Sequence, residues 1–237
     1  MRKYYICLMK NLPGILCVLS LVLFALVAAV LLPAQKTYSV LGDSYSSFSG
    51  YVTPASNPCY YSESPIYPND VCDVRKTWWW MWAEENGYVL QKNNSYSGAT
   101  VCNTGYSELD FSDRSFVTRM KNIGNPDVLF IFGGTNDARA GAPLGEYKYS
   151  GWTKADLYQF RPAFACMLDY LKREHPKMRI VNICNCGLSG DYNASMAAIC
   201  KHYGVECLLL ENIDKQHEHP SIVGMRQIVD QINAFMN

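Results

Sequence analysis

Residues 127–132 read Asp-Val-Leu-Phe-Ile-Phe, and Gly133-Gly134-Thr135-Asn136-Asp137 follows them directly. An unbroken apolar run of this length, closed by glycines, predicts a strand that is buried on both faces. Such strands are typical of parallel sheets that carry helices on both sides. The segment therefore favours an α/β fold, with the glycine-rich turn at the carboxyl end of a strand.

The rest of the chain repeats this alternation of strand and helix. Apolar runs predict strands at residues 37–41, 88–92, 179–184 and 205–210, and amphipathic stretches predict helices at residues 77–85, 155–174, 194–203 and 221–235. The pattern predicts a three-layer α/β/α sandwich around a central, mostly parallel five-stranded sheet. We find no internal repeat and no second domain, so residues 36–237 are expected to form one domain. Functional sites in such sheets lie at the carboxyl ends of the strands.

The N-terminal segment has the pattern of an export signal. Arg2, Lys3 and Lys10 precede an uncharged run over residues 15–32, and Lys36 follows it. Residues 1–35 are therefore predicted to be a cleaved signal peptide or a membrane anchor through residues 15–32. A buried core helix is the third possibility, but core helices rarely lack polar residues for so long. We expect an extracytoplasmic location, periplasmic or secreted.

Charge and cysteine content exclude some classes of protein. Lys plus Arg and Asp plus Glu number 21 each; three of the basic residues lie in the leader, which leaves 18 against 21. A nucleic-acid partner would require a basic face, so none is expected, and a neutral or weakly charged substrate is favoured. No Cys-x-x-Cys occurs, which argues against a zinc or redox site. Neither a metal nor an organic cofactor is expected.

Two pairs of cysteines stand close in the sequence. Cys59 and Cys72 lie in a long loop, residues 50–75, that is dense in Tyr, Ser and Pro. Export would permit disulfides, and this pair is the favoured one. Cys184 and Cys186 are two apart on a predicted strand, so they are expected to share a face as small apolar residues.

A serine stands where the first predicted strand ends, in Val40-Leu41-Gly42-Asp43-Ser44. A nucleophilic serine needs a sharp turn that exposes its hydroxyl, and Gly42 gives the turn backbone freedom. The Gly-x-Ser-x-Gly elbow is absent because position 46 is Ser. Ser44 is the candidate nucleophile, and a Gly-Asp-Ser turn that merely caps a helix is the alternative.

Two further loops are expected at the same rim of the sheet. Asn136 follows the strand at residues 127–132, and its amide could donate a hydrogen bond to a developing oxyanion. Gly98, in Ser97-Gly98 after the second predicted strand, could present its backbone N–H to the same oxygen. Each also has a structural interpretation: an Asx-capped turn for Asn136, and backbone geometry alone for Gly98.

The candidate base lies in Asp214-Lys215-Gln216-His217-Glu218-His219-Pro220-Ser221, before the last predicted helix. A loop there returns to the rim, where His219 can reach Ser44. Asp214 is close enough to orient the imidazole as the third member of a triad. His217 is the other histidine of this loop.

These four blocks, in this order, resemble the SGNH (GDSL-like) hydrolases, a family named for Ser, Gly, Asn and His in four sequence blocks. The resemblance covers residues 37–235. It implies a flavodoxin-like SGNH fold and acyl transfer to water through a Ser-His(-Asp) acyl-enzyme mechanism. Catalytic roles fall on Ser44, His219 and Asp214, and the oxyanion hole is implied at Ser44, Gly98 and Asn136.

One departure from the family pattern concerns the acid and the base. The family commonly has Asp-x-x-His, and Asp214 stands three residues before His217, whereas Gln216 stands three before His219. His219 is preferred as the base because Pro220 and the closing helix follow it. A Ser–His dyad assisted by a backbone carbonyl is the alternative to a triad.

The expected substrate is an ester, on a small molecule or a polysaccharide. Aromatic side chains on loops, which can stack on sugar faces, favour an acetylated carbohydrate: Tyr51, Tyr60, Tyr61, Tyr67 and Trp152. These rings could equally pack the loops against the domain. The four tryptophans within residues 78–82 are assigned to the core. A lysophospholipase or small-ester lipase, and a catalytically silent carbohydrate-binding module on the same scaffold, remain open.

Overall fold

The computed structural model describes residues 35–237 of the chain. The predictions of a signal peptide or anchor therefore lie, except for Gln35, outside the described residues. Among residues 35–237 no helix has both the length and the apolar character needed to cross a bilayer.

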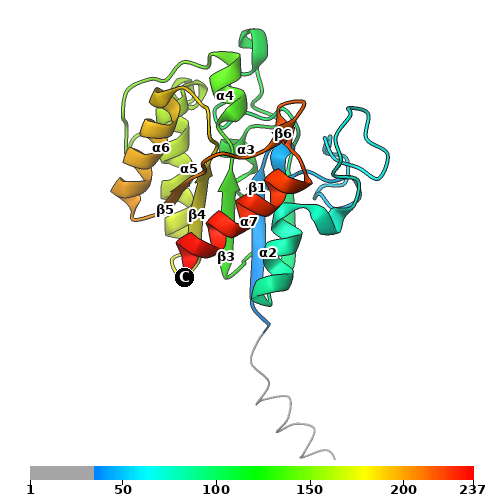
Figure 1. Ribbon diagram of the computed structural model, residues 1–237. Helices are drawn as coiled ribbons and strands as arrows, with labels where there is room; N and C mark the ends of the chain where they lie inside the picture. The colour runs from blue at the N-terminus through cyan, green and yellow to red at the C-terminus, as the bar shows by residue number, and fades with distance from the viewer. Residues whose placement is uncertain (1–34) are drawn as a thin grey trace, which may run out of the picture. The chain divides into compact units, whose positions relative to one another are not determined.

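Five parallel strands form the central sheet, in the order β2-β1-β3-β4-β5 (Figure 1). Their bounds are β1 Thr37–Gly42, β2 Val89–Ser95, β3 Val128–Phe132, β4 Arg179–Cys184 and β5 Glu206–Leu209. This order is the flavodoxin-like one, in which the chain reverses direction across the sheet between β1 and β3. The predicted α/β fold and its five-stranded sheet are confirmed.

Strand β3 is buried on both faces, and its side chains alternate between two cores. Phe130 and Phe132 belong to the core that contains α2 (Trp78–Asn86) and α7 (Ile222–Met236). Leu129 and Ile131 belong to the opposite core, formed with helices α3 Phe116–Arg119, α5 Phe160–Glu174 and α6 Gly190–Tyr203. The period of two along a strand sends successive side chains to opposite faces and so produces the three layers.

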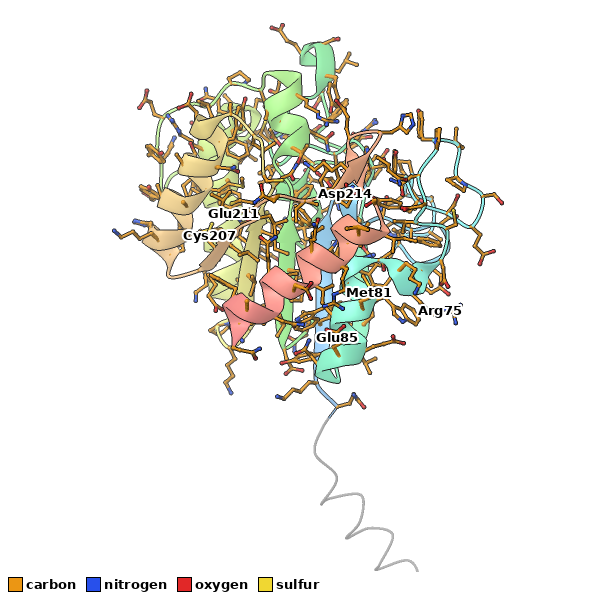
Figure 2. The ribbon with its side chains drawn as sticks, viewed as in Figure 1. Arg75, Met81, Glu85, Cys207, Glu211 and Asp214 are labelled. Atoms are coloured by element: carbon orange, nitrogen blue, oxygen red, sulfur yellow. The ribbon has the colours of Figure 1, made fainter. Side chains whose placement is uncertain are left out.

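The tryptophans of α2 fill the first core. Trp78 and Trp82 meet the ring of Phe130 edge-on, with centroids 5.6 and 4.6 Å apart. Glu85, near the end of the same helix (Figure 2), pairs with Arg226 of α7. The predicted core position is confirmed for Trp78, Trp79 and Trp82, whose side chains are at most 2% exposed.

Several boundaries differ from the sequence predictions. The helix expected at residues 155–174 is divided into η4 (Ala155–Tyr158) and α5, because Gln159 takes an extended conformation with φ −120° and ψ 139°. Cys186 lies beyond the end of β4, so it does not share a strand face with Cys184. Cys59 and Cys72 are both free, and the predicted disulfide between them is wrong. Each thiol instead faces a nearby backbone carbonyl, of Asn57 and Asn69 respectively.

The remaining short elements gather at the carboxyl ends of the strands. They include η1 (Ser44–Ser46), η3 (Tyr106–Glu108) and α4 (Thr135–Ala140). A two-stranded hairpin, β6 (Lys215–Gln216) with β7 (His219–Pro220), lies above the sheet near the start of α7 (Figure 1).

Candidate active site

Ser44 is the first residue of the one-turn helix η1, two residues after the end of β1. Asp43 caps the one-turn helix η1 by accepting a hydrogen bond from the N–H of Tyr45 at 3.0 Å. A Cβ at position 42 would come within 2.6 Å of Ser95 Oγ and 2.7 Å of the Ser46 side chain, so only glycine fits there. The tight passage of the chain at Gly42 therefore directs the serine to the rim of the sheet.

His219 reaches this serine from the hairpin. Its Nε2 lies 2.9 Å from Ser44 Oγ, although 175 residues separate the two in the sequence. The predicted encounter of Ser44 and His219 is present in the structure. His217 lines the same hollow, but it occupies the turn of the hairpin and not the position beside Ser44.

The other imidazole nitrogen faces a backbone carbonyl. His219 Nδ1 lies 2.9 Å from the oxygen of His217. A carbonyl can only accept, so Nδ1 carries the proton and Nε2 presents its lone pair to Ser44. The orientation of the carbonyl depends on a two-residue turn in which His217 and Glu218 both have positive φ, 46° and 63°.

Asp214, expected to orient this imidazole, has a different partner. Its carboxylate accepts a hydrogen bond from the hydroxyl of Ser221, the N-cap of α7; Figure 2 labels Asp214. Its backbone N–H donates to Gln227 Oε1 at 2.7 Å. Asp214 thus ties the loop before the hairpin to α7, and the geometry corrects the expected contact with His219.

Aromatic rings enclose the imidazole. Tyr60 stacks on His219 with centroids 3.5 Å apart and ring planes 7° apart, and Tyr45 lies 5.1 Å away. Burial is the main cause that lowers the pKa of His219 to about 4. The imidazole is therefore neutral at physiological pH, the form a general base requires.

The loop at residues 50–75 is fixed to the hairpin as well as to the imidazole. Asp70 and Gln216 exchange two hydrogen bonds, of 2.9 and 3.1 Å. The hydroxyl of Tyr61 donates to the carbonyl of Pro220 at 2.9 Å. Tyr60 and Tyr61 therefore pack the loop against the domain, whereas the side chain of Tyr67 is 56% exposed.

Three groups expected to form an oxyanion hole line one hollow: Ser44, Gly98 and Asn136. Within residues 35–237, no hydrogen bond to the protein engages the backbone N–H of Ser44 or of Gly98. Gly98 has φ +82°, and a Cβ there would meet no atom within 4 Å, so this part of the backbone faces open space. Two residues that line the hollow thus have backbone donors without a protein partner in the described part of the chain.

The amide of Asn136 is held from both ends. Its Oδ1 accepts from the hydroxyl of Tyr106 at 2.7 Å, and its Nδ2 donates to the carbonyl of Ala99 at 2.9 Å. A longer contact of 3.3 Å joins Nδ2 to Asp43 Oδ2. The amide hydrogen at this longer contact is the one that can turn to donate a hydrogen bond to a substrate oxygen.

Buried charges brace the loops that carry these donors. Asp137 accepts from the N–H groups of Val101 and Cys102 at 2.8 and 3.1 Å. Arg119 donates to the carbonyls of Gly42 and Asn94, at the ends of β1 and β2. Burial raises the pKa of Asp137 to about 6 and lowers that of Arg119 to about 9.

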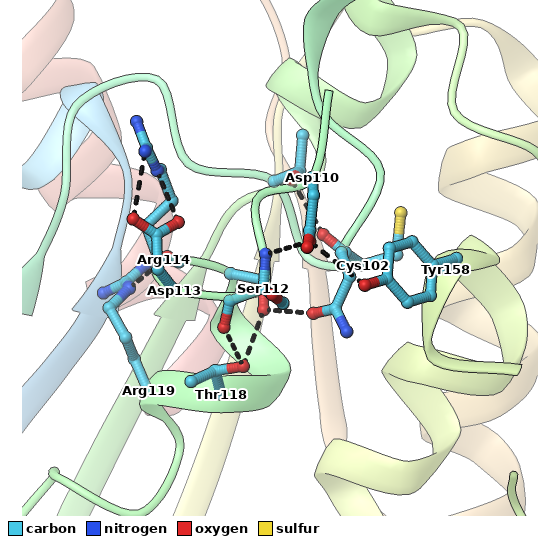
Figure 3. A network of polar contacts seen from close by, with 11 residues as sticks. Cys102, Asp110, Ser112, Asp113, Arg114, Thr118, Arg119 and Tyr158 are labelled. Carbon is cyan, nitrogen blue, oxygen red and sulfur yellow. Dashed lines mark hydrogen bonds and ion pairs between the residues drawn. The ribbon is translucent and has the colours of Figure 1, made fainter. Parts of the chain in front are cut away.

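A second network stabilises the segment that presents Tyr106 (Figure 3). Asp110 accepts from the N–H of Ser112 at 2.9 Å and from the hydroxyl of Tyr158 at 3.1 Å. Thr118 donates to the carbonyl of Ser112 at 2.8 Å. These bonds fold residues 102–118 back on themselves, and η3 projects from this fold toward α4.

Sequence reasoning missed three side chains, Tyr106, Arg119 and Arg139, and it allowed for a carbonyl-assisted dyad without identifying His217 as the source of the carbonyl. Arg139 lines the hollow beside Ser44 and pairs with Glu218 at 2.9 Å. Its spacing of three from Asn136 on one helix was a usable signal, because residues three apart share a face. A backbone carbonyl leaves no signal in the sequence.

The hollow itself has a volume of about 290 Å³. Its lining contains the serine, the imidazole and the oxyanion donors, and the remaining residues are Tyr45, Tyr60, Tyr67, Ser97, Tyr106, Thr135, Arg139 and His217. A hydroxyl with a neutral base at hydrogen-bond distance, and free N–H donors beside it, is an arrangement suited to acyl transfer.

Comparison with known proteins agrees with this chemistry. The family described as GDSL-like Lipase/Acylhydrolase matches residues 36–236. The chain belongs to this family. The members are hydrolases of ester bonds, and the chain is accordingly a GDSL-like esterase or lipase; the family resemblance inferred from the four blocks is confirmed.

Two solved structures assigned to the GDSL-like lipases are similar over most of their length. The one from Bacteroides ovatus is 53% identical, with a TM-score of 0.85 over 86% of this chain and 99% of its own. The one from Bacteroides uniformis is 55% identical, with a TM-score of 0.82 over 84% and 93%. An acetyl xylan esterase from Butyrivibrio proteoclasticus shares the fold at 15% identity, with a TM-score of 0.55 over 86% and 64%. No curated protein matches the chain.

Proposed function

We propose that this GDSL-like hydrolase removes a short acyl group, an acetyl group above all, from a carbohydrate through an acyl-enzyme on Ser44. The observation that carries the proposal is the 2.9 Å contact between His219 Nε2 and Ser44 Oγ, with Nδ1 fixed by a carbonyl. A dyad assisted by the His217 carbonyl replaces the Ser-His-Asp triad in this mechanism.

The reaction proceeds in two acyl transfers. Ser44 Oγ attacks the ester carbonyl while His219 Nε2 takes its proton, and the carbonyl oxygen becomes an oxyanion near the N–H groups of Ser44 and Gly98. Asn136 adds a third donor when it releases its long contact to Asp43. The imidazolium then returns the proton to the leaving alcohol, and water repeats the sequence on the acyl-enzyme to release the acid.

The dimensions of the hollow support a short acyl group. About 290 Å³ lies at the low end of ligand sites. A long fatty acyl chain would need more room, so a lysophospholipid is the less suited substrate. The exposed ring of Tyr67 beside the site offers a face for a sugar, and a distant relative of the same fold is an acetyl xylan esterase.

Hydrolysis of 4-nitrophenyl esters tests this proposal. We expect kcat/KM to be highest for the acetate and to fall by at least tenfold for the octanoate, and Ser44→Ala to lose about 10³-fold or more. A fluorophosphonate should label Ser44, as peptide mapping would show. Equal rates for the protein and for Ser44→Ala would instead favour a silent binding module.

Release of acetate from acetylated xylan, compared with release of fatty acid from a lysophospholipid, tests the substrate class. The proposal predicts release from the xylan at a kcat/KM at least tenfold above that for the lipid. The opposite ranking would assign the chain to the lysophospholipases.

We also propose that the protein acts outside the cytoplasm. The basic residues before the uncharged run at residues 15–32 support this location. Cell fractionation with detection of the chain, and sequencing of its mature N-terminus, would distinguish a cleaved signal from a retained anchor. Recovery of the intact chain in the cytoplasm would contradict the proposal.

A further inference from the structure

A second hollow adjoins the one that contains Ser44. Its volume is about 230 Å³, and Thr135 and Arg139 line both hollows. The rest of its lining comes from Ala138, Asn185, Cys186, Gly187, Leu188, Ser189 and Lys215. A substrate whose ester lies at Ser44 can therefore extend past Arg139 into this second space, which we call the side hollow.

The charged side chains that line the two hollows are both basic. Arg139 and Lys215 are the lining residues that carry a full charge, and no aspartate or glutamate is among the residues that line either hollow. Residues 36–237 as a whole contain 18 basic against 21 acidic residues. The positive charge is thus local to the site and opposite in sign to the net charge of the domain.

Arg139 is positioned by the helix that also carries Asn136. The two residues are three apart on α4, so their side chains leave the helix on the same face. Arg139 donates from one nitrogen to Glu218 at 2.9 Å, and the side chain of Glu218 is 73% exposed. A guanidinium has five N–H groups, and an ion pair with an exposed carboxylate is weak, so donors remain for a ligand.

Lys215 is positioned by the hairpin that carries His219. Its Nζ donates to Asn185 Oδ1 at 3.2 Å and lies 5.5 Å from the centre of the Tyr45 ring. One acceptor leaves two of the three ammonium hydrogens without a partner in the described part of the chain. Both cations also help to hold the pKa of His219 low.

We propose that the side hollow binds a carboxylate on the alcohol part of the substrate, so that the preferred ester is carried by an acidic sugar, a uronic acid. The inference rests on the proposed function and narrows its substrate class. A planar guanidinium and an ammonium that line one space suit a carboxylate, which can accept from both. Glu218 offsets part of the charge of Arg139, so the remaining positive charge matches a singly charged anion.

A matched pair of substrates tests the proposal: an O-acetylated methyl glucuronoside and its neutral methyl ester, which carry the same acetate on the same hydroxyl. We expect kcat/KM for acetate release to be at least tenfold higher for the acid at 20 mM NaCl. The ratio should shrink at 500 mM NaCl because salt screens the attraction. Free glucuronate should inhibit competitively at lower concentration than glucose, a readout that needs no variant.

Substitutions locate the effect. Arg139→Met and Lys215→Met should each lower the acid-to-neutral ratio of kcat/KM at least threefold, and Lys215→Glu should bring it below one. Lys201→Met, a control at an exposed lysine on α6, should leave the ratio unchanged. Unfolding midpoints of all variants would show that each is folded.

Equal kcat/KM for the two glucuronosides in the unsubstituted protein would overturn the inference and leave the esterase proposal standing. A preference that survives both methionine substitutions would overturn it as well, since the carboxylate would then bind elsewhere. No hydrolysis of either glucuronoside or of 4-nitrophenyl acetate would overturn the proposed function, and this inference with it.

Discussion

The imidazole of His219 has each of its nitrogens committed and one of its faces covered. Nε2 meets Ser44 Oγ at 2.9 Å, Nδ1 meets the His217 carbonyl at 2.9 Å, and Tyr60 lies flat against the ring. Among residues 35–237, no carboxylate forms a hydrogen bond with this imidazole. At the scale of single residues, the pKa of the base is thus set mainly by burial, with smaller contributions from the His217 carbonyl and from nearby charges.

The first prediction concerns pH. Because the pKa of His219 is lowered from 6.5 to about 4, kcat/KM should stay constant from about pH 8 down to about pH 5 and fall at lower pH, where the base becomes protonated. The same shift stabilises the fold above pH 6.5, and this stabilisation is lost as the pH falls through about 4. A pH–rate profile with 4-nitrophenyl acetate measures the first effect. An acid limb centred near pH 6.5 would contradict it.

The second prediction removes the covering ring. Tyr60→Ala exposes the imidazole to water, so the acid limb of the pH–rate profile should move up by about one unit or more. Tyr60→Phe is the matched control, since it keeps the stacked ring and should leave the limb in place. Identical limbs for the alanine variant and the unsubstituted protein would show that Tyr60 is not the cause of the low pKa.

The third prediction separates a dyad from a triad. Asp214→Asn should lower kcat by less than about tenfold, because the carboxylate contacts Ser221 and not His219. Where a carboxylate does orient the histidine, the same change costs on the order of 10⁴-fold. Steady-state kinetics of the purified variant decides between them, and a loss near 10⁴-fold would restore Asp214 to the triad.

The contacts that hold each site residue explain whether the sequence alone could reveal it. Ser44 and Asn136 could be predicted because each directly follows an apolar strand, and strand ends share a rim. Asp214 was misassigned because proximity in the sequence does not fix where a side chain points. Its carboxylate is directed by the N-cap of α7, a contact seven residues further along the chain.

At the scale of elements, the β6–β7 hairpin is the part of the fold that could not be predicted from the sequence. Strands of two residues have no periodicity, and the turn between them lacks the Asn-Gly or Asp-Gly pair that marks such turns. His217 and Glu218 nonetheless take positive φ at both positions, as a type I′ turn requires. Strand β3 was the clearest of the longer strands, because its five consecutive apolar residues leave little choice of structure.

The fourth prediction concerns this turn. Replacing His217-Glu218 by Asn-Gly places residues that accept left-handed backbone, and it should stabilise the fold by about 1 kcal/mol, or roughly 2–4 °C in Tm. Activity on 4-nitrophenyl acetate should persist, because the carbonyl at position 217 is retained. Calorimetry measures the gain, and a fall in Tm would show that the ion pair of Glu218 with Arg139 outweighs the relief of strain.

At the scale of the whole molecule, the two cores are complete within one domain. The buried residues of the first core run from Tyr38 to Ile232, and those of the second from Leu41 to Val205. Both cores therefore draw on strands β1, β3 and β4. Folding of this domain should need no contribution from the leader.

The fifth prediction follows from this organisation. A chain of residues 36–237 alone should fold cooperatively and hydrolyse 4-nitrophenyl acetate with the kcat/KM of the longest form that can be purified. Circular dichroism during heating and steady-state kinetics provide the comparison. Aggregation of the shortened chain under conditions in which the longer one is folded would show that the domain boundary at residue 36 is misplaced.

The carbonyl beside His219 Nδ1 has a consequence for genetics. An amino-acid substitution at position 217 changes the side chain and leaves the accepting oxygen in place, so a scan of single-codon replacements would record two essential residues where three groups cooperate. Revealing the third requires editing the main chain itself. An α-hydroxy acid installed at position 218 by semisynthesis would turn the amide into an ester, weaken that oxygen as an acceptor, and slow turnover without altering the histidine or the serine.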